Sequence, residues 1–343
     1  MNLLFFVKKH MICILFFLCI LTVSGCTAFQ KHLSDPVTKT GFYFDTVITL
    51  TIYDDSQKSL LDDCFSLADK YEKLFSSSIS TSDIAKINQA GQAPVTVDDE
   101  TISLLNTGLK YCALSGGGFD ITIGALSSLW NFSKNDGFLP SSGEIKEAVS
   151  SVGYQNIIIS GNEVSLKNPD AKIDLGGIAK GYIADRMKEL LNENGVTEGT
   201  INLGGNVLCL GEKKDGSNYR IGIQKPFDEH GTAAAVVEVT DQTVVSSGVY
   251  ERYITIDDKI YHHILNPATG YPYENHLLGV TIICDHSVDG DALSTVCFSL
   301  GLDQGMQLIE SLADTEAIFI TDDEKFHCSS GIGDAIPFEE LTP

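Results

Sequence analysis

Basic residues are scarce in this chain, and their scarcity excludes one large class of function. The sequence has 23 lysines and arginines against 46 aspartates and glutamates, which gives a formal charge of −23 at pH 7. Nucleic-acid binding depends on basic surface that neutralises phosphates, so we expect no nucleic-acid partner. The same charge is repelled by anionic lipid headgroups. An anionic ligand would therefore need a local positive group, such as a metal ion.

The sequence also lacks the cysteine and histidine spacings that mark zinc sites. Neither C-x-x-C nor H-E-x-x-H occurs in the chain. An even number of cysteines follows Cys26, which permits disulfides in an exported protein. Most of them lie in apolar helix or strand patterns, so they can equally be small buried hydrophobic residues, and both interpretations stay open. These cysteines are Cys64, Cys112, Cys209, Cys284, Cys297 and Cys328.

The apolar run near the N-terminus, residues 11–23, is too short to cross a bilayer. A spanning helix needs roughly 20 apolar residues, whereas a shorter run behind basic residues is typical of a signal peptide. The run ends in the sequence VSGC, which resembles the lipobox of bacterial lipoproteins. That resemblance implies that residues 1–25 are a signal peptide and that Cys26 is lipidated. A signal anchor with an incidental cysteine is the alternative.

Lipidation would hold a strongly acidic protein on a membrane. Burial of acyl chains contributes about 0.8 kcal/mol per CH₂, and stable anchoring takes more than one chain. Residues 26–40 show no periodicity and predict a lipidated polar tether. No linker rich in proline or glycine divides the rest, so residues 41–343 are expected to form a single domain. We expect the protein on the extracytoplasmic face of the cell membrane.

The domain mixes helical and strand periodicities. Residues 46–53 alternate as in a half-buried strand, while spacings of three and four predict helices over 60–74 and 102–112. A serine-rich loop at 76–82 follows the first of these helices. Several later strands succeed one another without a helix between them, which predicts an α+β fold with antiparallel sheet. Further strands are expected around 157–159, 200–203, 219–223, 234–239, 243–245, 252–256, 278–283 and 317–320, with helices at 177–194, 289–300 and 303–313.

Three glycine-rich segments are candidate ligand sites. The first, GGGFDITIG at 116–124, allows close backbone approach to a ligand. The second, DLGGIAKGY at 174–182, enters a predicted helix whose N–H groups could bind an anion, and Lys180 adds a cation. The third, NLGGN at 202–206, follows a strand. Each is also compatible with an ordinary turn, and the second lacks the G-x-x-x-x-G-K-[ST] spacing of a phosphate-binding loop.

A fourth segment, residues 246–295, brings together histidines and a possible cation site. It contains YHHILNPATGYP at 261–272 and, beyond a strand, the pair Asp291 and Thr295. Residues four apart on a helix share one face. Carboxylate and hydroxyl oxygens suit Mg²⁺, which keeps one or two protein carboxylates and shares the phosphates of a substrate. The alternative is a solvated helix start, with Asp291 near the positive end of the helix dipole.

In this order and spacing, DLGGIAKGY, YHHILNPATGYP and the D-x-x-x-T pair resemble the ApbE family, the FAD:protein FMN transferases. The resemblance extends from residue 46 to about residue 320. It implies an α+β fold related to the tunnelling fold, largely antiparallel sheet with flanking helices, and FAD in a central cleft. It also implies Mg²⁺-dependent transfer of FMN from FAD to a threonine or serine hydroxyl of an exported or membrane flavoprotein, with release of AMP.

The resemblance assigns roles by position in these motifs. His263 precedes Ile264 as the histidine of the family precedes its I-[IL]-[DN]-P run, so it is the expected general base, and His262 is a packing neighbour. The residues expected to contact FAD are Phe119, Asp120, Ile121, Asp174, Lys180 and Leu265. Those expected at the metal are Asp291, Thr295, a backbone carbonyl near Gly177, and Ser294 close by.

The chain departs from the family pattern at three places. The Met-Gly-Thr of many members reads Phe44-Asp45-Thr46, and Ser78 replaces a common aromatic residue. Both changes concern the isoalloxazine end of FAD, where a stacking aromatic would be missing. Asn266 stands where aspartate is common. None of the three touches the metal pair or the histidine.

Other functions stay open at this point. Flavin-carrying subunits of membrane electron-transfer complexes, or extracellular flavoproteins, are the expected acceptors. With water as the acceptor, the same site would be an FAD pyrophosphatase that yields FMN and AMP. A non-catalytic flavin-binding lipoprotein is the third candidate. The joint presence of Lys180, His263, Asp291 and Thr295 favours catalysis over mere binding.

We expect Cys26→Ser to release the protein from membranes or to leave it unprocessed. The lipobox-like VSGC ends the only candidate anchor that the sequence offers. Membrane fractionation and the mass of the N-terminal peptide would measure both effects. A Cys26→Ser protein that is still processed and fully membrane-bound would contradict the lipoprotein hypothesis.

Overall fold

Strand formation extends further toward the N-terminus than the sequence predicts. The computed structural model describes residues 36–132 and 138–341, so the expected signal peptide and Cys26 lie outside the described residues. Strand β1 (Val37–Tyr43) pairs along its whole length with β2 (Thr46–Ile52). The predicted tether over 26–40 was therefore wrong for residues 37–40. Polar, exposed side chains of an edge strand hid the strand pattern there.

In the described part of the chain, eight strands form the main sheet, and every pairing in it is antiparallel. This arrangement confirms the α+β fold with a largely antiparallel sheet. The strand order is β1-β2-β6-β7-β10-β13-β14-β15. The strands after β2 are β6 (Gly199–Leu203), β7 (Asn206–Leu210), β10 (Thr243–Gly248), β13 (Leu277–Cys284), β14 (Thr315–Thr321) and β15 (Phe326–Cys328).

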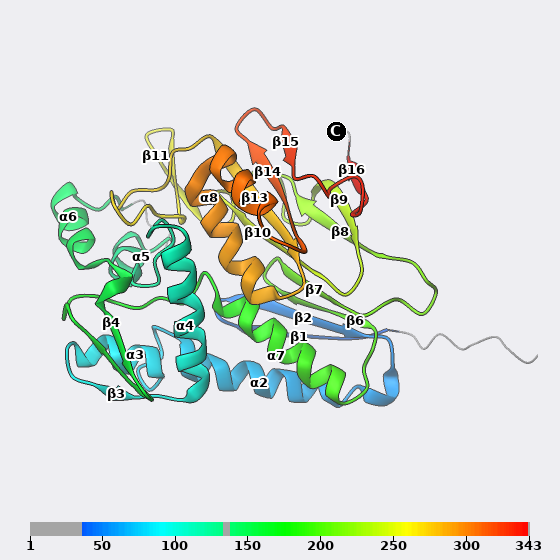
Figure 1. Ribbon diagram of the computed structural model, residues 1–343, viewed down its shortest axis with the longest axis horizontal. Coiled ribbons are helices and arrows are strands. Elements are labelled where there is room, and N and C mark those ends of the chain that lie inside the picture. The colour runs from blue at the N-terminus through cyan, green and yellow to red at the C-terminus, as the bar shows by residue number, and fades with distance from the viewer. Residues whose placement is uncertain (1–35, 133–137, 342–343) are drawn as a thin grey trace, which may run out of the picture. The chain divides into compact units, whose positions relative to one another are not determined.

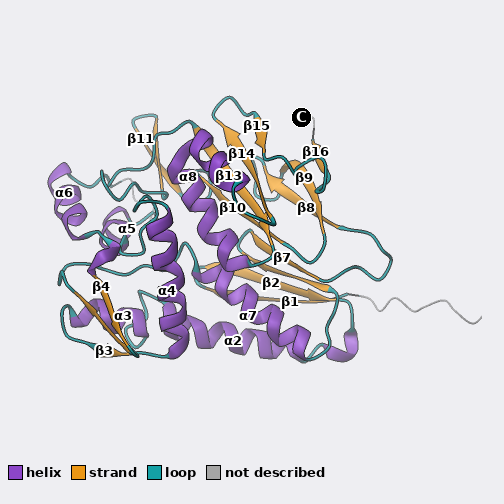
Figure 2. Ribbon diagram, viewed as in Figure 1, coloured by secondary structure: helices purple, strands orange, loops and turns teal. Residues whose placement is uncertain are grey.

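Helices cover one face of this sheet (Figures 1 and 2). They are α2 (Leu60–Phe75), α7 (Ala179–Glu193) and α8 (Ser287–Glu310), and α4 (Asp99–Leu114) packs against α8. Helix α8 packs on β10, β13 and β14, and α7 packs on α8 and β6. Within α8, Gly301 has a non-helical φ of 77° and ψ of 177°, which explains why the sequence predicted two helices there.

A smaller sheet packs on the opposite face of the main sheet. It consists of β16 (Phe338–Glu340), β9 (Ala233–Val239) and β8 (Tyr219–Gln224) in that order. Ile282 of β13 lies in the core under the helices, whereas its neighbour Ile283 lies in the core against the smaller sheet. Because both faces of β13 are buried, its sequence is a continuous apolar run rather than an alternating one.

A third cluster of buried residues joins the histidine segment to the first glycine segment. Leu126 and Trp130 of α5 (Gly124–Trp130) meet Ile145 of α6 (Ser142–Ser151) and Leu265. The hairpin of β11 (Tyr253–Ile256) and β12 (Lys259–His262) contributes Ile254. The remaining elements are α3 (Asp83–Ala90), β3 (Val95–Thr96), β4 (Ile157–Ser160), β5 (Glu163–Leu166) and the short 3₁₀ turns η1 (Asp55–Gln57) and η2 (Tyr154–Asn156).

The cysteines of the described residues are all free thiols. Cys64, Cys112, Cys209, Cys284 and Cys297 are buried, and Cys328 is exposed. This arrangement favours the interpretation of these cysteines as small buried hydrophobic residues. Over the same described ranges, no helix is both long enough and apolar enough to cross a membrane.

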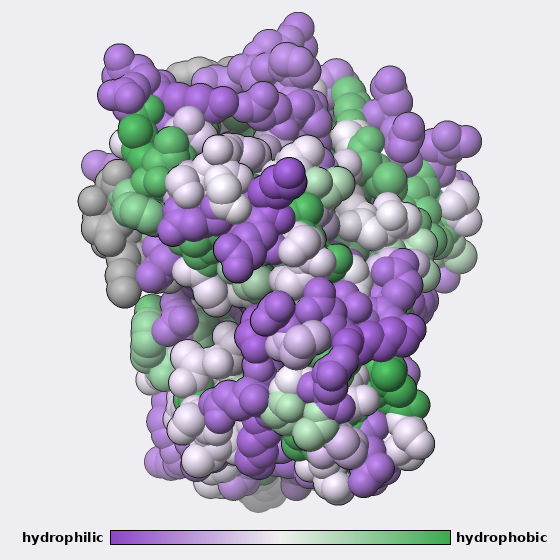
Figure 3. All heavy atoms as spheres, turned by 90° about the vertical axis from the view of Figure 1, so that its left-hand side faces the viewer, coloured by the Kyte–Doolittle hydropathy of each residue, from purple (hydrophilic) through white to green (hydrophobic). Residues whose placement is uncertain are grey.

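The face nearest α6, α3 and β4 is mainly hydrophilic (Figure 3). Its hydrophobic side chains form separate small patches rather than one continuous area. Scattered exposed apolar residues are normal on protein surfaces and mark no interaction site by themselves. Buried polar residues instead gather between α7 and α8.

Candidate active site

The second glycine segment, DLGGIAKGY, forms the loop before α7 and its first turn. Helix α7 begins at Ala179, and N–H groups in a first turn have no partner inside their own helix. The N–H of Gly181 instead donates to Oδ2 of Asp291 on α8, over 2.9 Å. The helix start predicted to bind an anion therefore contacts a carboxylate of the protein itself, and this contact joins the second segment to the fourth.

Glycine is needed at position 181 because two helices meet there. A Cβ atom on Gly181 would lie 2.2 Å from the carbonyl oxygen of Ser287 and 2.7 Å from Cα of Val288. Both neighbours are backbone atoms, so a side chain would fit only if α8 moved away from α7. Such a movement would separate Asp291 from the Gly181 N–H.

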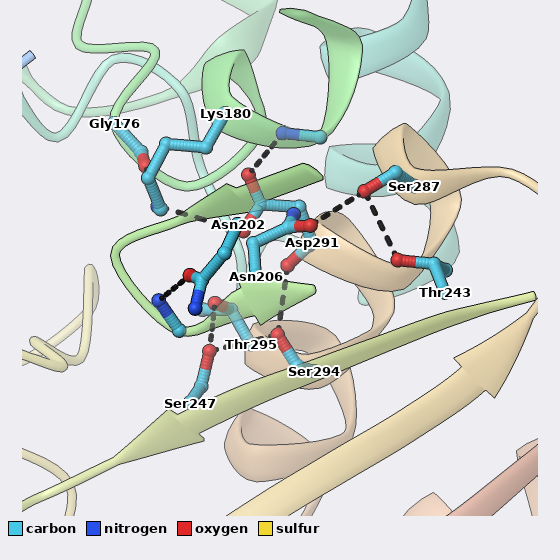
Figure 4. A network of polar contacts seen from close by, with 12 residues as sticks. Gly176, Lys180, Asn202, Asn206, Thr243, Ser247, Ser287, Asp291, Ser294 and Thr295 are labelled. Carbon is cyan, nitrogen blue, oxygen red and sulfur yellow. Dashed lines mark hydrogen bonds and ion pairs between the residues drawn. The ribbon is translucent and has the colours of Figure 1, made fainter. Parts of the chain in front are cut away.

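Lys180 supplies the positive charge beside Asp291. Its Nζ lies 3.6 Å from Oδ1 of Asp291 and donates to the carbonyl oxygen of Gly176 over 3.2 Å. Figure 4 shows the lysine side chain reaching from the start of α7 toward the carboxylate. The Asp291 side chain is only 6% exposed, so solvent screens this pair less than it screens an ordinary surface pair.

Hydroxyl groups lie next to Asp291 on α8 and on β10. Ser294 Oγ donates to the backbone oxygen of Asp291 over 2.9 Å and lies 2.7 Å from Ser247 Oγ. Ser247 Oγ also lies 3.4 Å from Thr295 Oγ1 (Figure 4). Ser247 belongs to none of the motifs that predicted the site. Its only signal was its place at the start of the fourth segment.

The oxygen donors in this cluster suit a hard cation such as Mg²⁺. Asp291 offers a buried carboxylate, and Thr295 offers a hydroxyl one helical turn later. Among residues 36–132 and 138–341, no group of three or more His, Cys, Asp or Glu side chains is placed to hold a metal ion. A cation here would depend on one carboxylate, on hydroxyl and backbone oxygens, and on the phosphates of a ligand. That combination is usual for magnesium.

The first glycine segment contacts the second. The N–H of Asp174 donates to the carbonyl oxygen of Ile121 over 2.8 Å, and the ring of Phe119 lies against Gly177. Asp174 itself accepts from Ser127 Oγ over 2.6 Å and from the N–H of Gly176 over 2.9 Å. Phe119 and Asp174 therefore both lie at the glycine loop before α7, and their contact with FAD stays a prediction.

Asp120 holds its own loop together. Its carboxylate accepts from the N–H and hydroxyl of Thr122 over 2.8 and 2.7 Å, and from the N–H of Tyr154 over 2.8 Å. Burial raises the pKa of Asp120, and these hydrogen bonds oppose that shift. The neighbouring Ile121 is 1% exposed and packs against Gly108. A role in flavin binding for these two residues stays a prediction, since both are engaged within the protein.

His263 follows directly after β12 and is fixed by Arg252. Its backbone N–H and its ring Nδ1 both lie at the carbonyl oxygen of Arg252, over 3.0 and 3.2 Å. A carbonyl only accepts, so Nδ1 carries the proton and Nε2 keeps its lone pair. Burial lowers the pKa of His263 to about 3, and the nearby charges of Arg252 and Lys180 act in the same direction. The half-buried ring is therefore a neutral base at physiological pH.

His262 is held in a different way. Its Nε2 lies 2.9 Å from the carbonyl oxygen of Tyr273, so Nε2 carries the proton, and its ring packs edge-on against Phe298. His262 is 6% exposed, and burial lowers its pKa. Leu265, also 6% exposed, packs with Trp130. His262 is thus the packing neighbour that the sequence analysis expected.

The comparison with known proteins agrees with this arrangement. Residues 44–319 match the sequence profile of the ApbE family. The chain belongs to this family. It is 35% identical to an FAD:protein FMN transferase of Klebsiella pneumoniae (strain 342), over 82% of this chain and 88% of that protein. It is 34% identical to the FAD:protein FMN transferase of Treponema pallidum, over 80% of this chain and 81% of that protein.

Solved ApbE structures share the fold. The ApbE protein of Thermotoga maritima superposes with a TM-score of 0.80 at 29% identity, covering 86% of this chain and 97% of its own. The flavin transferase ApbE of Vibrio cholerae gives a TM-score of 0.77 at 25% identity, covering 87% of this chain and 98% of its own. The family resemblance inferred from the motifs is therefore confirmed.

One departure from the ApbE pattern lies in the turn between β1 and β2. Phe44 and Asp45 have φ values of 52° and 54°, as the two central residues of a type I′ hairpin turn do. The N–H of Phe44 donates to Oε1 of Glu72 on α2 over 2.7 Å. Asn266, where ApbE proteins commonly have aspartate, accepts from the N–H of Ala268 over 2.9 Å. Its amide oxygen thus does in the turn what a carboxylate oxygen would do.

The third glycine segment also reaches the site of this ApbE protein. Asn206 is 2% exposed, and its Oδ1 accepts from Ser287 Oγ over 2.7 Å. Ser287 lies one turn before Asp291 on α8, and Thr243 Oγ1 donates to its Oγ over 3.1 Å (Figure 4). All four segments singled out in the sequence therefore meet around the starts of α7 and α8.

We expect His263 and His262 to be neutral with opposite tautomers at pH 7 and above, because burial lowers the pKa of both. The proton of His263 should sit on Nδ1, facing Arg252, and that of His262 on Nε2, facing Tyr273. Nitrogen chemical shifts of the imidazole rings distinguish the tautomers, and His263→Ala and His262→Ala would assign the signals. Protonation of His263 near pH 6 to 7 would contradict the effect of its burial on the pKa.

Proposed function

We propose that this ApbE-family enzyme transfers the FMN half of FAD to a threonine or serine hydroxyl of an exported or membrane flavoprotein, with AMP as the leaving group. The observation that carries the proposal is the grouping of a cation, a buried carboxylate and a neutral imidazole near the start of α7. Lys180 contacts Asp291, and its charge also acts on His263. These are the groups that transfer of a phosphate ester requires.

His263 is the proposed general base. Its unprotonated Nε2 accepts the proton of the acceptor hydroxyl as the hydroxyl oxygen bonds to the phosphorus of the FMN half. The bond from that phosphorus to the bridging oxygen breaks, and AMP leaves with the oxygen and its electron pair. The lowered pKa of His263 keeps the base free of protons at neutral pH, although it also weakens its basicity. The product is FMN joined to the acceptor by a phosphodiester.

Lys180 and the start of α7 are proposed to stabilise the phosphates. The lysine ammonium is in place at the positive end of the helix dipole before any ligand binds, whereas the first-turn N–H groups of Ala179 and Gly181 already donate to Leu175 and Asp291. Preorganised groups of this kind stabilise negative charge that develops during a reaction. The net negative charge of the protein repels the phosphates of a dinucleotide. A positive potential at the binding site alone is enough to offset this repulsion, and these groups would provide it.

We propose Mg²⁺ as the metal, held by Asp291 and Thr295 with a backbone carbonyl near Gly177 and with Ser294 close by. When bound, Mg²⁺ would neutralise charge on the pyrophosphate oxygens and on the leaving AMP. The support is the chemistry of the donors, which are all oxygen atoms, and the burial of Asp291, which is 4% exposed. Ser294 is proposed to orient Asp291, because it donates to the backbone oxygen of that residue.

We also propose that the protein works on the extracytoplasmic face of a membrane through a lipid on Cys26. The support is the VSGC sequence after a short apolar run. A tether raises the local concentration of enzyme around acceptors in the same membrane. Subunits of membrane electron-transfer complexes and extracellular flavoproteins are therefore the proposed partners, and the acidic charge argues against nucleic acid.

With FAD, Mg²⁺ and an exported acceptor domain, we expect the acceptor to gain the mass of FMN faster than free FMN appears. A hydroxyl bound in line with the scissile phosphate has an effective molarity that unpositioned water lacks. Intact-protein mass spectrometry and chromatography of free flavin would follow both products together. Rapid release of FMN, with no mass gain on several acceptor domains, would favour the pyrophosphatase function instead.

Two histidine variants serve as controls in that experiment. His263→Ala should slow the transfer by about 10²–10⁴, as removal of a general base does. His262→Ala should have the smaller effect, because its ring is buried and its Nε2 is already bonded to the carbonyl oxygen of Tyr273. If His262→Ala slowed the transfer more than His263→Ala, the assignment of the general base to His263 would be wrong.

Asp291→Asn should remove the dependence of the transfer on Mg²⁺ concentration, together with most of the activity. The amide keeps one oxygen that can accept from the Gly181 N–H, whereas Asp291→Ala would leave that buried donor unpaired, at about 1–3 kcal/mol of unfolding free energy. Asp291→Asn therefore separates the metal role from the structural one. Turnover against Mg²⁺ concentration and thermal melting would be measured side by side.

Asp289→Asn is the matched control for this variant. Asp289 lies two residues earlier on the same helix, and its carboxylate accepts from the hydroxyl of Tyr111. Its side-chain partners in the described part of the chain are Tyr111 and Lys110, and neither is a proposed metal ligand. We expect a normal Mg²⁺ response from Asp289→Asn. Normal turnover and a normal Mg²⁺ response from Asp291→Asn would show that the metal assignment is wrong.

A further inference from the structure

Helices α7 and α8 hold each other through two buried carboxylates that face in opposite directions. Asp291 of α8 accepts from the N–H of Gly181 on α7. Asp185, one turn further along α7, accepts from the N–H groups of Ser287 and Val288 on α8, over 2.8 and 2.9 Å. The sequence analysis gave Asp185 no role, because both of its partners are more than one hundred residues away.

The start of α8 depends on Asp185 for its cap. The residue before the helix, His286, makes no side-chain capping bond in the described structure. The N–H groups of Ser287 and Val288 have no partner inside the helix, since the first turn never provides one. Ser287 is completely buried, so water cannot replace a missing acceptor there. Asp185 supplies both acceptors from the neighbouring helix.

The side chain of Ser287 holds the same turn from the other side. Its hydroxyl donates to Asn206 Oδ1 and accepts from Thr243 Oγ1 (Figure 4). The first turn of α8 is therefore fixed by α7 through its backbone and by the sheet through its side chain. A helix start held in this way has little freedom to slide or rotate.

The position of Asp291 follows from the position of this turn. Ser287, Asp291 and Thr295 are four residues apart in succession, so they lie on one face of α8. Four residues correspond to about 6 Å along a helix. Any movement of the first turn is passed directly to the carboxylate and hydroxyl, and this would weaken their hold on a metal ion.

We propose that Asp185 is a positioning residue for the site, which sets the place of the Asp291 and Thr295 oxygens by clamping the first turn of α8 to α7. The claim that Asp185 matters for metal binding rests on the proposed function. The clamp itself, which is the pair of hydrogen bonds from α8 to Asp185, does not depend on that function. Asp185 contacts neither oxygen, so it acts through the helix.

The burial of Asp185 supports this role. Asp185 is 8% exposed, and burial raises its pKa to about 6, although the two N–H groups act in the opposite direction. Burying a carboxylate at this place is thus unfavourable for the charged form. Buried charges often contribute less to stability than apolar residues of similar size would, so the benefit of Asp185 lies in defining one geometry.

Amide hydrogen exchange on the unmodified, metal-free protein is the first test. If the clamp exists, the amides of Ser287 and Val288 exchange as slowly as amides in the middle of α8. First-turn amides without a partner inside their helix or in the surrounding protein exchange much faster. Fast exchange at these two positions would overturn the proposal without any variant.

Asp185→Asn is the second test, because it keeps the size of the side chain and replaces one acceptor oxygen by an NH₂ group. Exchange over residues 287–291 should become faster in the metal-free protein. The Mg²⁺ concentration for half-maximal transfer should rise about 10-fold or more, as it does when a residue that supports a metal ligand is lost. Turnover at saturating Mg²⁺ should stay close to that of the unmodified enzyme.

Asp83→Asn is the matched control. Asp83 is 6% exposed, and its carboxylate accepts from the N–H of Asp98 and the hydroxyl of Thr101 at the start of α4. It thus holds the N-terminus of a different helix, whose own N-cap is Asp98, from a neighbouring element. Asp83→Asn should loosen the start of α4 and leave both the Mg²⁺ response and the exchange of residues 287–291 unchanged.

The outcomes separate this proposal from the proposed function. Faster exchange in α8 with an unchanged Mg²⁺ response would reduce Asp185 to a structural cap and overturn its positioning role. An equal change in the Mg²⁺ response from Asp83→Asn would point to general destabilisation and overturn it as well. If the unmodified protein shows no metal-dependent transfer at all, the proposed function fails, while hydrogen exchange still decides whether the clamp exists.

Discussion

The contact between the Asp291 carboxylate and the Gly181 N–H is the interaction on which the site depends. It requires that α7 and α8 approach so closely that a Cβ atom at position 181 would overlap the backbone of Ser287. The antiparallel sheet makes this approach possible, because it places both helices on the same face. Lys180 reaches Asp291 only from that helix start, and Thr295 follows one turn further on α8. Removing the close approach would therefore separate Lys180 and the start of α7 from the oxygen groups of α8.

The distribution of charge follows from the same contact. The chain carries twice as many acidic as basic residues, so its long-range field repels an anionic ligand. At the start of α7, however, a lysine and a helix N-terminus lie together, and Asp291 has little exposure to solvent. Local charges in a poorly hydrated place act more strongly than the screened charges of the surface. The overall charge thus limits which partners approach, while the local arrangement decides what is bound.

The sequence predicted those parts of the fold and site that depend on local patterns. Alternation predicted β2, and the spacing of Asp291 and Thr295 predicted that both share a face of α8. Edge strand β1 was missed because its exposed side chains are polar, and helices α5 and α6 were missed because they are short. Ser247 and Asp185 were missed because their partners are distant along the chain. Contacts of this kind exist only once the sheet and helices have assembled, so no local sequence pattern predicts them.

The two adjacent histidines show that such non-local contacts determine which ring nitrogen of a histidine is protonated. Spacing alone does not separate His262 from His263, and only their place in the family motif did so. In the folded protein, the hairpin turns them toward different carbonyl groups, Tyr273 for one and Arg252 for the other. The first bond occupies Nε2 of His262, whereas the second occupies Nδ1 of His263 and leaves its Nε2 unprotonated. Since the hairpin of β11 and β12 places Arg252 opposite His263, the geometry of that hairpin, rather than the histidine by itself, defines which nitrogen can accept a proton.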